Sequence, residues 1–118
     1  MTKNRDTLIT AGVTAFNAGH YDEAFMQFQT FWLTARSNES KALAQYANAC
    51  NQMKLGLVTA PRVMLARALS LTDDEPRQTE VNIMRMRADI THLLALLPPE
   101  ENEFDSSSLS FGQLEWKQ

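Results

Sequence analysis

The feature that most constrains this chain is a stripe of large side chains that repeats with the period of an α-helix. The stripe runs at spacings of three and four through Tyr21, Ala24, Phe25, Phe28, Phe31, Trp32 and Ala35. This spacing puts the side chains on one face of a helix, whereas a half-buried strand would alternate at every second residue. Because so many aromatic side chains share one face, other helices must cover them.

The same helical period recurs along the chain, and glycine or proline punctuates it. We expect helices over about 5–17, 21–36, 39–55, 60–71 and 76–97. Gly19 is suited to a left-handed position after the first helix, and Pro98 and Pro99 end the fifth. No strand pattern competes. The predicted fold class is therefore all-α, with two antiparallel helix hairpins and a C-terminal capping helix whose stripe is Ile83, Met86, Ile90, Leu93 and Leu97.

Charge divides the chain into two regions. Residues 1–97 carry ten Lys or Arg and nine Asp or Glu, whereas residues 98–118 carry five acidic residues and one lysine. We predict a helical domain over 1–98 and an acidic, partly disordered tail over 99–118. The tail is punctuated by Phe104, Leu109, Phe111, Leu114 and Trp116. The alternative is therefore a segment that docks these side chains onto an apolar groove of its own domain or of a partner.

An internal repeat relates the two predicted hairpins. Gly19, Tyr21, Ala24, Phe28 and Phe31 recur 37 positions later as Gly56, Val58, Pro61, Leu65 and Ala68. The first copy resembles the tetratricopeptide repeat, in the order Gly-x-Tyr-x-x-Ala-x-x-x-Phe. The second copy departs from it, with valine for the aromatic residue and proline for the alanine. The resemblance implies paired antiparallel helices.

The stretch from Thr7 to Leu71 also resembles an uncharacterised helical family, domain of unknown function three-hundred-nine. The resemblance rests on Phe16-Asn17-Ala-Gly19-His-Tyr21-Asp-Glu23-Ala24, then Trp32, then Leu65-Ala-Arg-Ala68-Leu69. Where that family has a histidine and two acidic residues, this chain has Phe25, Met26 and Gln29. The resemblance thus implies a scaffold that has lost its polar cluster, and a degenerate enzyme-like or metal-linked protein is a remote alternative.

Chemistry-bearing residues are sparse. His20 stands beside Asp22 and Glu23, but adjacent side chains in one turn do not converge readily on a metal. His92 suits the C-terminal end of a helix, and Cys50 falls on an apolar helix face. The glycines are isolated, so no phosphate-binding loop is present. We expect no enzymatic activity, no metal and no cofactor.

Composition narrows the partners and the compartment. The formal net charge is −3, and neither region has the basic excess expected of a nucleic-acid binder. The longest apolar run, Leu93 to Leu97, is far shorter than a membrane span, and the N-terminal residues show no secretory signal. A single cysteine excludes an intrachain disulfide. We therefore expect a cytoplasmic protein that contacts neither nucleic acid nor membrane.

The aromatic excess of the second helix suggests a binding face. We predict that Phe25 and Trp32 mark a groove closed by a partner peptide, by the tail or by a second copy in a homodimer. Arg62 and Arg85 are candidates for a patch that holds the protein's own acidic tail or an acidic partner peptide, and Phe111 and Trp116 are candidates within the tail. The favoured hypothesis is a non-enzymatic adaptor or chaperone-like module that binds a protein or peptide. The alternative is an assembly subunit of a homo- or hetero-oligomer.

Overall fold

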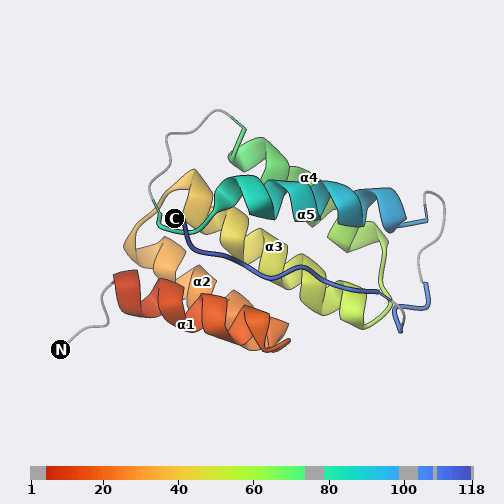
Figure 1. Ribbon diagram of the computed structural model, residues 1–118, viewed down its shortest axis with the longest axis horizontal. Helices are drawn as coiled ribbons and strands as arrows, with labels where there is room; N and C mark the ends of the chain where they lie inside the picture. Colours follow the sequence, from red (N-terminus) through yellow and green to blue (C-terminus); the bar gives the residue numbers. More distant parts are fainter. Residues whose placement is uncertain (1–4, 74–78, 99–103, 108, 118) are drawn as a thin grey trace.

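The protein is built from five α-helices, as the sequence predicts (Figure 1). The computed structural model describes residues 5–73, 79–98, 104–107 and 109–117. The helices are α1 (Arg5–Asn17), α2 (Tyr21–Thr34), α3 (Asn38–Lys54), α4 (Thr59–Leu71) and α5 (Ile83–Leu96). The first four pack in chain order, each against the next, and α5 packs on the face above α3 and beside α4 (Figure 1).

Local sequence signals set the helix ends. Gly19 and Gly56 follow α1 and α3 with φ angles of +83° and +86°, the left-handed conformation in which glycine is favoured. At the start of α3, Ser37 and Ser40 form a capping box in which each side chain accepts a hydrogen bond from the other residue's backbone N–H, both at 3.1 Å. The predicted left-handed turn at Gly19 is confirmed.

The two hairpins bury equivalent residues. Tyr21, Ala24, Phe28 and Phe31 on α2 are buried, and so are their counterparts Val58, Pro61, Leu65 and Ala68. Every residue of the repeat that follows the turn glycine therefore points into the core in both copies. This explains why the 37-residue spacing persists although Val58 and Pro61 differ from the first copy.

The fifth helix begins later than the sequence predicts. Helix α5 starts at Ile83 and not at Pro76, and its N-cap is Asn82, whose side chain accepts a hydrogen bond from the backbone N–H of Arg85 at 3.0 Å. Just before the cap, Val81 pairs in an antiparallel bridge with Trp116, which draws the backbone out of the helix. The prediction for 76–82 was wrong over the described residues 79–82, and residues 76–78 lie outside the described part.

The helices enclose one hydrophobic core. The stripe predicted for the fifth helix faces inward, with Ile83, Met86, Ile90 and Leu93 all at most 1% exposed. The largest fully buried side chains come from α1, α2, α3, α4 and α5 together: Phe16, Phe28, Phe31, Tyr46, Leu65 and Met86. The capping role predicted for α5 thus holds.

Residues 109–117, which we call the strap, cross the molecule in an extended conformation. The strap runs over α3, between α1 and α5, and ends beside the start of α5 (Figure 1). Leu114 is buried in the common core at 3% exposure, and the partly buried Leu109 and Phe111 pack against this core. This stretch of the acidic tail is therefore seated on its own domain.

Within the described residues, every helix is too short or too polar to cross a lipid bilayer.

Candidate partner-binding groove

A groove of about 550 Å³ opens on the side of the molecule made by α2, α3 and α4. Helix α3 forms its floor with Ala44, Gln45 and Asn48, and Ala44 and Asn48 leave room because their side chains are short. Helices α2 and α4 each pack on α3 and form the two walls. The lining residues are Phe25, Gln29, Trp32, Lys41, Ala44, Gln45, Asn48, Ala60, Val63, Met64 and Arg67.

Apolar side chains stand on both walls. Phe25 and Trp32 project from α2 and Val63 and Met64 from α4, and the core does not fully cover any of the four. Val63 is 55% exposed. Phe25 and Trp32 are seven residues apart, so they lie two helical turns apart on one face, about 10 Å along the axis. The structure thus brings together the two residues that sequence analysis singled out on α2.

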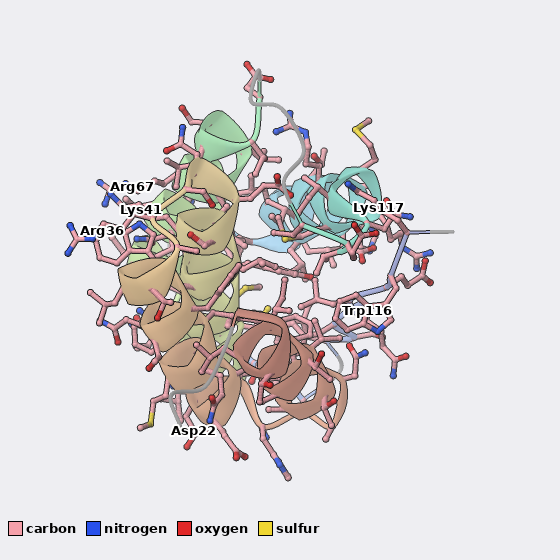
Figure 2. All side chains as sticks on the ribbon, turned by 90° about the vertical axis from the view of Figure 1, so that its left-hand side faces the viewer. Asp22, Arg36, Lys41, Arg67, Trp116 and Lys117 are labelled. Carbon is pink, nitrogen blue, oxygen red and sulfur yellow. The ribbon has the colours of Figure 1, made fainter. Side chains whose placement is uncertain are left out.

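Cationic side chains gather at one end of this groove. The guanidinium carbon of Arg36 lies 4.9 Å from the centroid of the Trp32 ring, and the ammonium of Lys41 lies 5.9 Å from it. Arg67 reaches the same region from α4, so that the three cations stand together at one edge of the molecule (Figure 2). Placed over the ring face, Arg36 and Lys41 are held by cation–π attraction.

The other predicted partner-binding residues lie elsewhere and hold the chain together. Arg62 donates to the carbonyl of Pro98, at the end of α5. Arg85 pairs with Asp89 at 3.3 Å and with Glu115 of the strap at 3.4 Å. Phe111 meets the ring of Tyr21 edge-on at 5.1 Å between centroids. Trp116 forms the bridge with Val81 and is 41% exposed.

Polar contacts fix the strap at two places. The side-chain amide of Asn17 donates to the carbonyl of Leu114 at 2.9 Å, and its oxygen accepts from the N–H of Leu114 at 2.8 Å. Beyond Leu114, the N–H of Asn82 donates to the carbonyl of Glu115 at 2.7 Å, and the N–H of Lys117 donates to the backbone carbonyl of Glu80 at 2.6 Å. Of the predicted residues, Phe111 and Trp116 therefore belong to the strap and Arg85 contacts it. All three lie away from the groove.

The remaining chemical groups have structural surroundings. Cys50 is fully buried, and burial raises the pKa of its thiol, which disfavours the nucleophilic thiolate. The hydroxyl of Tyr46 is also buried, and it has no nitrogen or oxygen partner among the described residues. The Nδ1 atom of His20 lies 3.9 Å from Oε2 of the exposed Glu23. Within the part of the chain that is described, no group of three His, Cys, Asp or Glu side chains could share a metal ion.

Two cations that line the groove, Lys41 and Arg67, are not among the residues that were predicted to bind a partner. Each belongs to a helical ridge that carries groove residues, since Lys41 precedes Ala44 and Gln45 by three and four positions and Arg67 follows Val63 by four. That spacing was visible in the sequence. Their approach to Trp32 was not, because it depends on how α2, α3 and α4 pack.

Comparison with protein-family models, with curated proteins and with solved structures found no match for this chain. The resemblances to tetratricopeptide repeats and to the uncharacterised helical family therefore stay predictions.

Proposed function

We propose that this protein is a non-enzymatic adaptor that holds a segment of a partner protein in the groove between α2 and α4. The observation that carries the proposal is the pair Phe25 and Trp32, which stand partly exposed on one wall of a concave surface and face Val63 and Met64 on the other. Partly exposed aromatic side chains in a pocket are typical centres of binding energy in protein interfaces.

The chemistry of the rest of the molecule supports an adaptor more than an enzyme. The thiol of Cys50 is sealed in the core, and the described histidines are not joined to a nucleophile or a metal group. A single buried cysteine also fits the reducing cytoplasm, which is where we place this adaptor.

The alternative of an assembly subunit has less support. In this hypothesis, the apolar stripe of the fifth helix, together with the tail, contacts another subunit. That stripe is instead buried in the chain's own core, where solvent hardly reaches Ile83, Met86, Ile90 and Leu93. The groove, at about 550 Å³, is larger than the hollow of about 350 Å³ that Leu96, Phe104 and Asp105 help to line.

Site-directed photo-crosslinking in the native host tests the adaptor. A photoreactive phenylalanine analogue replaces Val63 in the groove or, as a matched control, Met84, which is 66% exposed on α5. We expect discrete protein adducts from position 63 that disappear when Trp32→Ala is added, and none of these adducts from position 84. Helical circular dichroism of Trp32→Ala checks that the fold persists. Equal adducts from both positions, or adducts that survive Trp32→Ala, would refute the proposed function.

A further inference from the structure

The cations at the groove have no acidic partner among the described residues, in contrast to Arg85 and Arg87 of α5. Arg85 and Arg87 are paired with Asp89, Glu115 or Asp73 at 3.2–3.4 Å. Arg36, Lys41 and Arg67 form no ion pair with any described carboxylate. Two of them are held over the ring of Trp32 instead. Their charge is therefore available to a ligand.

The groove also reverses the charge of the whole molecule. The chain has a formal net charge of −3, yet the residues that line the groove include Lys41 and Arg67 and no aspartate or glutamate. Its other polar side chains, Gln29, Gln45 and Asn48, are neutral. A local positive field on an acidic protein favours an acidic partner and repels a basic one.

The spacing of the apolar residues indicates the shape of the ligand. Phe25 and Trp32 present two contacts separated by two helical turns, and Val63 and Arg67 on the opposite wall are one turn apart. A partner helix with apolar residues at positions i, i+3, i+4 and i+7 has the same repeat. The short side chains of the α3 floor allow such a helix to approach closely.

We propose that the groove binds an amphipathic helical segment of a partner protein whose apolar stripe contacts Phe25 and Trp32 and whose carboxylates reach Arg36, Lys41 and Arg67. This inference rests on the proposed function and specifies the chemistry of the partner. It differs from adaptor binding in general because it requires both an apolar stripe and acidic residues near one end of that stripe.

The described parts of the chain do not supply this segment. The strap carries one acidic residue, Glu115, but it lies between α1 and α5, and its labelled residues Trp116 and Lys117 are on the opposite side of the molecule from the cations (Figure 2). The groove and the strap are therefore separate surfaces (Figure 2), and no described segment of the chain occupies the groove.

Trp32 provides an intrinsic reporter for the test. The chain has two tryptophans, so Trp116→Phe leaves Trp32 as the only indole. In this variant we titrate a synthetic amphipathic peptide that carries a leucine stripe with glutamates on its polar face. Two further peptides carry glutamine or lysine in place of every glutamate. The proposal predicts that the emission of Trp32 shifts with the glutamate peptide at the lowest concentration, and that the lysine peptide binds most weakly.

Neutral substitutions then identify the cations responsible. We expect Arg36→Gln, Lys41→Gln and Arg67→Gln each to weaken the glutamate peptide by about two- to fivefold, with an effect that fades as salt is added. Lys117→Gln is the matched control because it removes the same charge on the opposite side of the molecule (Figure 2). The glutamine peptide should bind equally to all four variants.

The outcomes separate the two proposals. If the lysine peptide binds as tightly as the glutamate peptide, or if Lys117→Gln weakens binding as much as Lys41→Gln, the acidic partner is overturned while groove binding stands. If no peptide shifts the emission of Trp32, the helical acidic ligand is refuted, and the crosslinks from position 63 then decide whether the adaptor fails as well. If the emission shifts with protein concentration alone and sedimentation shows a dimer, a second copy occupies the groove and the proposal is wrong.

Discussion

Asn17 contributes two of the hydrogen bonds that attach the strap, and Asn17→Ala tests this contribution directly. Asn17 both donates to and accepts from the backbone of Leu114, at 2.9 and 2.8 Å, across 97 positions of sequence. Alanine removes both contacts and leaves the N–H and the carbonyl of Leu114 without these partners. At about 0.5–1.5 kcal/mol for each hydrogen bond, the strap should lose about 1–3 kcal/mol of docking free energy.

Other contacts keep the strap in place when Asn17 is lost. Leu114 is still buried, Phe111 still meets Tyr21, and Asn82 still donates to the backbone of Glu115. The variant should therefore stay folded while the strap opens locally more often. A loss of about 1–3 kcal/mol corresponds to opening that is roughly 5 to 150 times more frequent.

Native-state amide exchange measures this opening residue by residue. We expect exchange to accelerate by that factor at the hydrogen-bonded amides of Leu114 and Lys117, while amides in the centre of α3 change far less. Thr14→Ala is the control, because Thr14 is exposed on the same helix, one turn earlier. Asn17→Asp should give an intermediate effect, since its carboxylate still accepts but no longer donates. Strap amides that exchange at the unprotected rate already in the unmodified protein would refute the docking argument.

Three further perturbations follow from the packing and from one shifted pKa. Gly12→Ala should lower the free energy of unfolding by about 1–3 kcal/mol in urea denaturation, because a Cβ at Gly12 would lie 2.3 Å from the ring of the fully buried Phe28; Phe28→Leu in the same chain should relieve part of the loss, and full additivity would contradict the close contact. Gly112→Ala should cost less than Gly12→Ala by the same assay, because its Cβ would meet the carboxylate of Asp89, a side chain that can rotate away; an equal cost would show that the strap is held as rigidly as the core. Burial raises the pKa of Tyr21 from 10.0 to about 12, so the neutral form is favoured in the folded state, and the resulting stability is complete below pH 10 and lost as the pH rises from 10 to 12; unfolding free energies of the unmodified protein should fall below those of Tyr21→Phe in this window, and parallel curves would argue against a buried hydroxyl.

Elements whose signals are local could be predicted from the sequence. The aromatic stripe of α2 and the glycines at 19 and 56 determine where helices form and end, because spacing and a positive φ act within a few residues. The error at the start of α5 has a long-range cause. Asn82 caps the helix while its backbone pairs with the strap, a contact between positions about thirty apart that no local pattern reveals.

The candidate site shows the same division between local and long-range information. Phe25 and Trp32 could be predicted because an excess of aromatic side chains on one helix is visible in its own sequence. Arg85 was predicted to hold an acidic segment, but its contacts with Asp89 and Glu115 could not be located from the sequence, since they depend on where the strap lies. Lys41 became part of the site only because α3 packs so that its first turn comes near Trp32.

A described segment of the chain lies between α1 and α5, whereas none lies in the groove between α2 and α4. This difference is the strongest argument for an external partner. Between α1 and α5 the chain supplies its own extended segment, with a buried Leu114 and reciprocal hydrogen bonds from Asn17. Between α2 and α4 no described segment covers the exposed faces of Phe25 and Trp32, and the nearby cations have no described carboxylate. Leaving apolar surface exposed to water costs free energy. The strap shows that this chain is able to cover such surface with its own residues. A groove kept open in a chain that can cover apolar surface elsewhere is therefore best explained by a ligand that binds there.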